Sequence, residues 1–151
     1  SRDALCSAAA AMGLEVVKSR SAREALAGAD IVVSSVTLSA DVNPFLNAHW
    51  LDAGAFATIT DLPMSWEPGG MSAFDRVFID DMEQELKSDQ PLMSAELIDG
   101  DLSSLVQKTT SGRTAEGERT AFVFRGLALG DLALAALAYD RATGASGSDG
   151  R

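Results

Sequence analysis

The sequence predicts an α/β fold with a parallel β-sheet, and three features carry this prediction. The run Ala29–Val33 is apolar, β-branched and too short for a helix, which is typical of a strand buried in a parallel sheet. A second short apolar run, Ala55–Thr60, has the same character. Helical patterns with short links separate such runs along the chain. This alternation favours parallel pairing through right-handed crossovers.

Capping residues and apolar periodicity define the N-terminal elements. An apolar face at helical spacing ends before Gly13, where a glycine C-cap is expected. Ser21 and Glu24 form a capping box, and the helix that they begin is predicted to end before Gly28. The predicted elements are a helix at Arg2–Met12, a strand at Leu14–Val17, a helix at Ala22–Ala27 and a strand at Asp30–Val36.

Turn and cap residues divide the middle of the chain. Asn43 and Pro44 indicate a helix start, with Asn as the N-cap and Pro at the first helical position, and Gly54 closes that unit. The segment Leu62–Ser72 is rich in proline and glycine and is predicted to be an irregular loop. The elements predicted after it are strands at Phe74–Asp80 and Arg119–Phe124, a helix at Asp81–Lys87, short helices within Ala95–Lys108 broken at Asp99-Gly100, and a polar loop at Thr109–Glu118.

A last helix is predicted from Gly126 to about Arg141. Its apolar residues lie almost all round the helix, so it is predicted to be buried on most sides. Asp131, inside this helix, must then be solvated, paired or turned towards a site. Glycine and serine dominate from Thr143 onward, and this tail is predicted to be disordered.

Composition limits the classes of function. The net charge of −10, without a basic stripe, argues against a nucleic acid or an anionic membrane as partner, because phosphates would be repelled. No apolar run approaches the roughly 20 residues that span a bilayer, and no signal peptide is found. Cys6 is the single cysteine, which excludes an internal disulfide and suits a cytoplasmic protein. No metal is expected, because Asp80-Asp81 has no further ligand at suitable spacing. The chain starts at Ser1 without a methionine, and we expect it to be a piece of a longer protein.

Polar side chains gather where the two clearest strands are predicted to end. Ser34, Ser35 and Thr37 follow the first strand, and Asp61 follows the second. Ligands bind at this edge of open parallel sheets. From the residues alone, however, an Asp before X-Pro is more often a turn former than a catalytic residue, and the hydroxyls are equally well strand-end caps.

Five segments form an ordered set along the chain: GADIVVSSVT at 28–37, WLDAGA at 50–55, DLP at 61–63, DRVFIDD at 75–81 and FVFRGLALGDL at 122–132. No single segment is diagnostic, but the set in this order and spacing is fairly specific. It resembles the ornithine cyclodeaminase/mu-crystallin family of NAD(P)-dependent enzymes, and the resemblance covers nearly everything from Ser1 to Ala142.

The resemblance implies a Rossmann-type parallel sheet that lacks its first strands. Residues 1–108 would form a partial NAD(P)-binding domain, residues 109–142 a strand and helix that return to the substrate-binding and dimerisation domain, and residues 143–151 the disordered tail. The glycine-rich phosphate loop would precede Ser1, together with the Arg and Lys that hold the substrate carboxylate. The intact protein would be a homodimer, and the isolated chain would be inactive.

The resemblance also implies hydride transfer from the Cα of an amino acid to a nicotinamide, which leaves an imine. In a cyclodeaminase the side-chain amine then attacks the imine, ammonia leaves and the hydride returns. Asp61 would be the catalytic carboxylate that moves protons near the amine. The small-molecule partner would be an amino acid or a cyclic imine. Three alternatives stay open: an NADPH-dependent ketimine reductase, an amino-acid dehydrogenase and a non-catalytic nucleotide-binding member.

By the same resemblance, the adenosine-ribose and pyrophosphate of NAD or NADP would lie along Ser34, Ser35, Val36 and Thr37. Arg2 would meet the adenosine 2′ position, where a guanidinium suits the 2′-phosphate and slightly favours NADP. Judged as a residue near a chain end, Arg2 is more often a solvated surface charge.

Three places depart from the family's pattern. Thr60 stands in place of a Gly, Met64-Ser65 in place of Gly-Lys, and Phe124-Arg125-Gly126 in place of Ser-Val-Gly. These positions touch the nicotinamide and the substrate in the family, so Thr60 is assigned to the cofactor and Arg125 and Gly126 to the substrate. Arg125 would contact the substrate carboxylate, or would only pair with Asp131. The departures leave the substrate open, and ornithine is not assumed.

Overall fold

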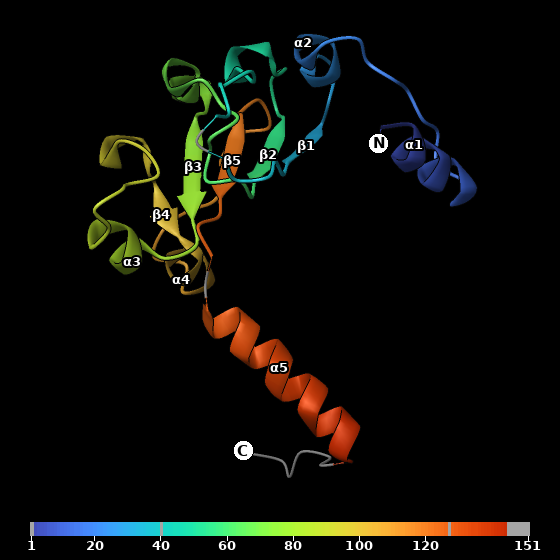
Figure 1. The fold of residues 1–151 in the computed structure, drawn as a ribbon. Coiled ribbons are helices and arrows are strands. Elements are labelled where there is room, and N and C mark those ends of the chain that lie inside the picture. The colour runs from blue at the N-terminus through green and yellow to red at the C-terminus, as the bar shows by residue number, and fades with distance from the viewer. Residues whose placement is uncertain (1, 40, 127, 145–151) are drawn as a thin grey trace.

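The computed structural model describes residues 2–39, 41–126 and 128–144, and its centre is a five-stranded parallel sheet (Figure 1). All four strand pairings are parallel, as the sequence predicts. The spatial order is β1-β2-β5-β3-β4. The strands are β1 (Ile31–Ser34), β2 (Phe56–Ile59), β3 (Arg76–Ile79), β4 (Gly100–Asp101) and β5 (Thr120–Val123).

The pairing register brings the strand ends to one edge of the sheet. Ser34 pairs with Ile59, Ile59 with Val123, and Val123 with Ile79. The residues that follow these four strands therefore leave the sheet side by side. Because all strands are parallel, this edge is the carboxyl edge, where such sheets bind ligands.

The central strands carry the core mainly on one face of the sheet, because the register places Ala121 beside Ala57, and Val123 between Ile59 and Ile79. Ala57, Ile59, Ile79, Ala121 and Val123 are fully buried. These side chains from β2, β3 and β5 are small or β-branched, as expected of strands in the middle of a parallel sheet. Further core residues come from loops and 3₁₀ turns and include Leu46, Leu51, Trp66, Met71 and Phe74.

Helices and 3₁₀ turns connect the strands. Ser21 caps α2 by accepting a hydrogen bond from the Glu24 N–H, as predicted. The other half of the predicted capping box does not form, because the Glu24 carboxylate accepts the N–H of Arg20 and not that of Ser21. At the start of α4 the backbone N–H of Ser104 bonds the carboxylate of Asp101 and lowers the pKa of that group. The elements are α1 (Arg2–Ala11), α2 (Ala22–Leu26), η1 (Ala48–Trp50), η2 (Pro68–Ala73), α3 (Met82–Leu86), η3 (Ala95–Leu97), α4 (Leu102–Val106) and α5 (Ala128–Thr143).

Two predicted elements are wrong. Leu14–Val17 forms no strand, because no neighbouring strand among the described residues pairs with it, and Leu14 and Val17 are exposed. The helix start at Asn43-Pro44 is also wrong. The cap lies four residues later at Asn47, whose side chain accepts the His49 N–H, while Leu46 is held in a parallel bridge with Trp66.

The last helix, α5, is present, but its predicted burial is wrong for the structure described. Every described residue of α5 is exposed, and the helix extends away from the sheet (Figure 1). Nothing in the described ranges packs against it, so Leu129, Leu132 and Leu134 face solvent. Asp131 is solvated for the same reason. Leu127 lies outside the described residues.

The segment predicted to return to a second domain begins inside the sheet. Its strand is β5, which pairs with β2 on one side and β3 on the other. The assignment of α5 to a second domain stays a prediction. Thr143, which was expected in the disordered tail, is the last residue of α5, and residues 145–151 lie outside the described part of the chain.

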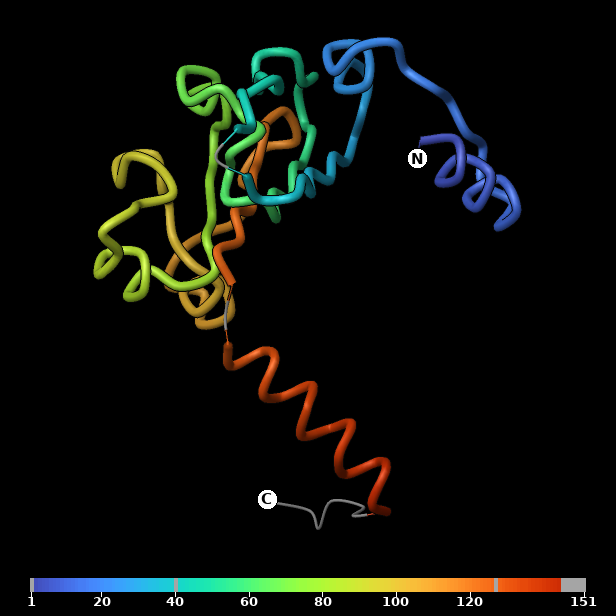
Figure 2. Tube along the Cα trace, in the orientation of Figure 1, coloured from blue at the N-terminus to red at the C-terminus, as the bar shows by residue number. Residues whose placement is uncertain are grey.

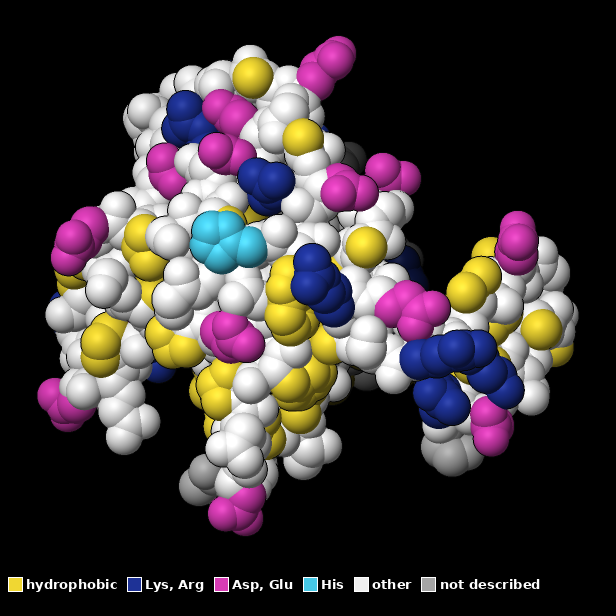
Figure 3. All heavy atoms as spheres, turned by 90° about the horizontal axis from the view of Figure 1, so that it is seen from above, with side chains coloured by type: hydrophobic (Ala, Val, Ile, Leu, Met, Phe, Trp, Pro, Cys, Tyr) yellow, Lys and Arg dark blue, Asp and Glu magenta, His cyan; other side chains and the backbone are white. Residues whose placement is uncertain are grey.

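The N-terminal helix α1 stands apart from the sheet, joined to it by an extended link and α2 (Figures 1 and 2). On the face shown in Figure 3, basic side chains are interspersed with acidic ones and form no continuous basic stripe. Among the described residues, no helix is both long enough and apolar enough to cross a membrane.

Candidate functional site

Residues from four strand ends meet at the carboxyl edge of the sheet. Ser34 is the last residue of β1, Asp61 lies two residues beyond β2, and Arg125 lies two residues beyond β5. Asp80 follows β3 directly. This edge therefore holds three buried polar side chains and a half-buried arginine within a few residues of the sheet.

Asp61 is buried and accepts a hydrogen bond on each carboxylate oxygen. The Ser34 hydroxyl donates to Oδ1 at 2.9 Å, and the Ser65 hydroxyl donates to Oδ2 at 2.6 Å. Asp61 is only 1% exposed. Within the described ranges no cation forms a salt bridge with it. Two neutral hydroxyls therefore stabilise this carboxylate, which would otherwise be costly to bury.

The Ser34 hydroxyl is itself fixed by Trp66. The indole Nε1–H of Trp66 donates to Ser34 Oγ at 3.0 Å. A serine hydroxyl has a single proton, and here that proton is directed to Asp61. Trp66, Ser34, Asp61 and Ser65 thus form one buried hydrogen-bonded group, which we name the Asp61 cluster.

The turn after β2 brings Ser65 back onto Asp61. The Met64 N–H donates to the Asp61 carbonyl at 3.1 Å, so the chain reverses immediately. Leu62 has φ 53°, a left-handed conformation that is uncommon for a leucine. Such backbone is often found at binding and catalytic sites. The Ser65 carbonyl accepts the N–H groups of Phe45 and Leu46, which ties the turn to a distant segment.

A second group of residues holds the segment after β5. The carboxylate of Asp80 accepts the N–H of Arg125 at 3.1 Å and that of Gly126 at 2.8 Å. Gly126 has φ 121°, which side-chain-bearing residues rarely adopt. The Arg125 guanidinium donates to Glu85 from Nε at 3.1 Å and from Nη2 at 2.6 Å, and also bonds the Gln90 carbonyl.

The partner of Arg125 is therefore Glu85 on α3. The alternative pairing with Asp131 is wrong, because α5 projects away while Glu85, only 5% exposed, lies beside the guanidinium. No pattern in the sequence identifies Glu85 as this partner, since the two residues are 40 positions apart. Arg125 still borders a cavity of about 270 Å³, whose other walls are Leu62, Met64, Gln90, Pro91 and Leu92.

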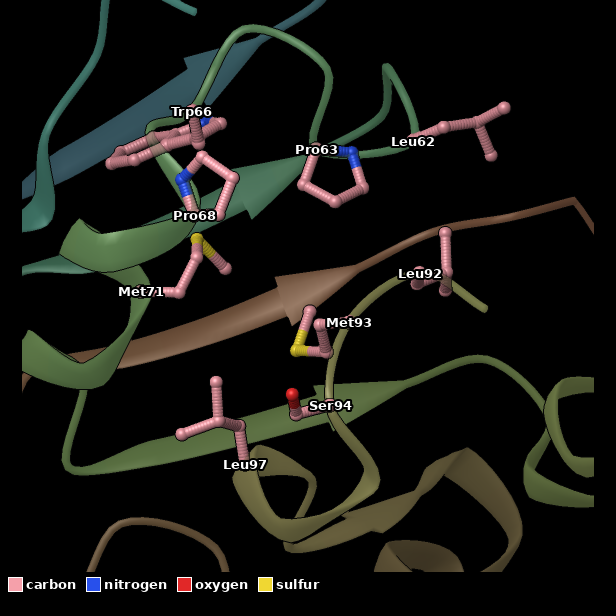
Figure 4. A pocket seen from close by; sticks show the side chains of 9 residues that line it. All are labelled: Leu62, Pro63, Trp66, Pro68, Met71, Leu92, Met93, Ser94 and Leu97. Atoms are coloured by element: carbon pink, nitrogen blue, oxygen red, sulfur yellow. The ribbon is translucent and has the colours of Figure 1, made fainter. Parts of the chain in front are cut away.

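A second cavity, of about 170 Å³, lies beside the first and shares Leu62 and Leu92 with it. Its walls are almost entirely apolar, with Met71, Met93 and Leu97 converging on it and Ser94 as the one hydroxyl (Figure 4). Trp66 lines this cavity with its ring and holds Ser34 with its N–H. The indole is therefore the member of the Asp61 cluster that also forms part of the cavity wall.

The residues predicted to bind the cofactor are only partly brought together. Ser34 belongs to the Asp61 cluster, and the exposed Thr60 hydroxyl donates to the Ser34 carbonyl at 2.9 Å. Ser35 and Thr37 are exposed just beyond β1, with Val36 half-buried between them. Their contact with a cofactor stays a prediction.

Arg2 does not reach this group. It lies on α1, apart from the sheet, and its guanidinium donates to the Ser19 carbonyl at 3.4 Å. Ser65 and Trp66 are the cluster members whose role was not predicted. The Asp-x-x-x-Ser spacing is compatible with a turn that returns to the aspartate, but only the structure shows that this turn forms. In the described ranges, no three His, Cys, Asp or Glu residues are placed to hold a metal ion.

Comparison with known proteins gives one family and several solved structures. The model of the ornithine cyclodeaminase/mu-crystallin family matches residues 1–146. No curated protein matches the chain. Among solved structures, the probable ornithine cyclodeaminase of Bordetella pertussis Tohama I has a TM-score of 0.76 and 24% identity, over 100% of this chain and 50% of that one.

Two further structures share the fold. The Δ(1)-pyrroline-2-carboxylate reductase of Thermococcus litoralis, in complex with NADH and L-proline, has a TM-score of 0.73 and 20% identity, over 95% of this chain and 47% of that one. An archaeal alanine dehydrogenase dimer with bound NAD has a TM-score of 0.75 and 21% identity, over 97% and 48%. The chain thus spans about half the length of these proteins.

Proposed function

The chain belongs to the ornithine cyclodeaminase/mu-crystallin family, and on this premise we propose that the intact protein is an NAD(P)-dependent enzyme acting on an amino acid or its imine. The leading candidate is an amino-acid cyclodeaminase that forms an imine by hydride transfer. The observation that carries the proposal is the position of Asp61, a carboxylate beyond β2 at the carboxyl edge of a parallel sheet. Solved structures of the same fold bind NADH or NAD, which supports a nicotinamide cofactor here.

The exposed hydroxyls at the end of β1 fit a dinucleotide. Ser35 and Thr37 are exposed just beyond the strand, and Thr60 is exposed beside them. The Ser35 and Thr37 hydroxyls can donate to ribose and phosphate oxygens, whereas the Thr60 hydroxyl, whose proton goes to the Ser34 carbonyl, can only accept. Arg2 is remote from these residues, so the structure offers no support for NADP over NAD. A bound nicotinamide would supply the hydride acceptor.

Asp61 would hold and move a proton at the amine. It carries a carboxylate whose hydrogen bonds come from neutral groups, so its negative charge is not cancelled by a neighbouring cation in the part of the chain that is described. A substrate ammonium would find a counter-charge there. Since Asp61 is 1% exposed, this role requires the side chains that cover its carboxylate to move when the substrate binds.

The test is the Asp61→Asn variant of the intact protein. Turnover should fall by about 10²-fold or more, because general acid–base catalysis contributes that much, while cofactor binding is unchanged. Asp99→Asn is the matched control. Asp99 accepts the Val77 N–H near the opposite edge of the sheet, so this variant should lose stability and keep its turnover. Full activity of Asp61→Asn would refute the catalytic role.

The substrate assay separates the candidates. Ornithine, lysine, alanine and cyclic ketimines are incubated with NAD, NADP or NADPH, while nicotinamide absorbance and ammonia are followed. Ammonia release without net change in absorbance indicates a cyclodeaminase, and oxidation of NADPH by a cyclic imine indicates a ketimine reductase. Net reduction of the cofactor together with ammonia release indicates a dehydrogenase. Cofactor binding without turnover on any of these compounds would favour a non-catalytic member.

A further inference from the structure

We propose that Ser65 is a positioning residue for the reaction. Its hydroxyl holds the carboxylate of Asp61 in one orientation, opposite the hydroxyl of Ser34. The inference rests on the proposed function. It assigns to the Ser65 hydroxyl the task of orienting the Asp61 carboxylate.

The geometry fixes both ends of the carboxylate. Ser65 bonds Oδ2 at 2.6 Å and Ser34 bonds Oδ1 at 2.9 Å, so the two donors act on different oxygens. One donor is anchored in β1 and the other in the turn that follows Asp61. With both bonds made, rotation of the carboxylate about its Cβ–Cγ bond would break at least one of them.

The two serines are not equivalent. Ser34 also accepts the Trp66 indole N–H, and its carbonyl accepts bonds from both the backbone and the side chain of Thr60. Loss of the Ser34 hydroxyl would therefore remove two hydrogen bonds, one to Asp61 and one from Trp66, while the bonds to its carbonyl would remain. In the ranges that the structure describes, the Ser65 hydroxyl makes one hydrogen bond, the one to Asp61.

Removal of the Ser65 hydroxyl leaves its backbone held. The Ser65 carbonyl accepts the N–H groups of Phe45 and Leu46, both at 2.9 Å, and neither bond involves the side chain. A Ser65→Ala variant is therefore expected to keep the turn and lose one donor to the carboxylate. Misorientation of a proton-transferring group slows the chemical step while it leaves ground-state binding unchanged.

The experiment measures steady-state kinetics of the intact protein with the substrate identified by the assay above. For Ser65→Ala we expect kcat to fall on the order of tenfold, the cost of one such hydrogen bond, with KM and the cofactor Kd within about twofold. Ser65→Cys keeps a weak donor of similar size and should recover part of kcat. Ser104→Ala is the control for stability alone, since the Ser104 hydroxyl accepts the Asp101 N–H in the capping box of α4 and touches no part of the Asp61 cluster.

A crystal structure of the intact Ser65→Ala variant gives a readout that does not depend on turnover. The Asp61 carboxylate should be rotated or present in more than one conformer, against one conformer in the unsubstituted protein. If the Asp61 carboxylate keeps its single orientation in Ser65→Ala, the inference is overturned. It is also overturned if Ser65→Ala keeps its kcat and only loses thermal stability, as Ser104→Ala is expected to do. Asp61→Asn distinguishes failure of this inference from failure of the proposed function. If Asp61→Asn is inactive while Ser65→Ala is fully active, only the positioning role of Ser65 fails. If Asp61→Asn is active, the proposed function fails too.

Discussion

At the scale of single residues, Asp61 and Arg125 are two ionisable side chains that are largely removed from water and have different kinds of partner. Asp61 is held by two neutral hydroxyls, one on each carboxylate oxygen. The charge of Arg125 is offset by Glu85 at 2.6 Å. An arginine with its own buried counter-ion is less suited to bind a substrate carboxylate. We therefore expect Arg125 to act first as a structural tie that also lines the cavity beside Leu62.

The pKa of Glu118 is lowered, and the cause of this shift can be tested by substitution. The hydroxyl of Thr114, followed by its backbone N–H, lowers the pKa of Glu118 from 4.5 to about 2. Because the folded-state pKa is the lower one, the stabilisation is fully present above about pH 4.5 and is lost as the pH falls towards 2. Thr114→Val should raise the pKa of Glu118 in an NMR titration of its carboxyl carbon. Thr114→Ser keeps the hydroxyl and should leave the low pKa in place.

At the scale of elements, the strands were predictable and their partners were not. Ile31–Val33 and the run around Ala57 predict strands by composition, and both form. The predicted burial of the first strand is wrong, because β1 lies at an edge of the described sheet and Ile31 and Val33 are exposed. Leu14–Val17 has a similar composition but no partner, since pairing is decided by residues far along the chain. Asn47 replaces Asn43 as a cap because the bridge between Leu46 and Trp66 fixes that segment. More than one residue of a segment can serve as the N-cap of a helix, and tertiary contacts determine which residue does.

The candidate site, too, could be predicted only where it does not depend on contacts between distant residues. Asp61 was predicted from its place after a strand and from the family pattern, because both are visible in the order of residues. Its bonds to Ser34 and Ser65 depend on the register of β1 with β2 and on a tight turn. The Trp66 N–H that directs Ser34 depends on packing. These are properties of the folded chain, and no local pattern encodes them.

The ion pair between α3 and the segment after β5 yields a prediction at this scale. Glu85→Ala leaves Arg125 largely buried without its counter-ion, and the free energy of unfolding should fall by about 2 kcal/mol. We place the cost below that of a fully buried pair because the bond to Gln90 remains. Denaturant unfolding of the intact protein measures it. The double variant Glu85→Leu/Arg125→Met should recover most of the loss, and a double variant as unstable as Glu85→Ala would contradict this account.

At the scale of the whole molecule, several apolar surfaces are uncovered. Ile31 and Val33 on β1 and the described leucines of α5 are exposed, and no described strand pairs with the outer edge of β1. Monomeric proteins rarely leave such surfaces open. The chain spans about half the length of the solved structures that it resembles. We expect these surfaces to be covered in the intact protein.

This expectation predicts the behaviour of the 151-residue chain on its own. It should bind the apolar dye ANS, self-associate at concentrations where the intact protein does not, and show no turnover with any substrate of the intact protein. Light scattering and dye fluorescence measure the first two properties, and the substrate assay measures the third. The intact protein, at equal molar concentration, is the control. Tight binding of NAD or NADP by the chain alone would show that the nucleotide site is complete within it, contrary to this view.

The place of β5 has a consequence for how the chain acquires its shape during synthesis. Phe56 of β2 pairs with Thr120, and Arg76 of β3 pairs with the same residue, so the strand made last joins two strands made long before. While the nascent polypeptide leaves the ribosome, β2 and β3 have no common neighbour and their edges stay open. The sheet closes only after residue 123 has emerged. Long-range pairing of this kind slows folding, and it gives chaperones a window in which to act on the half-made domain.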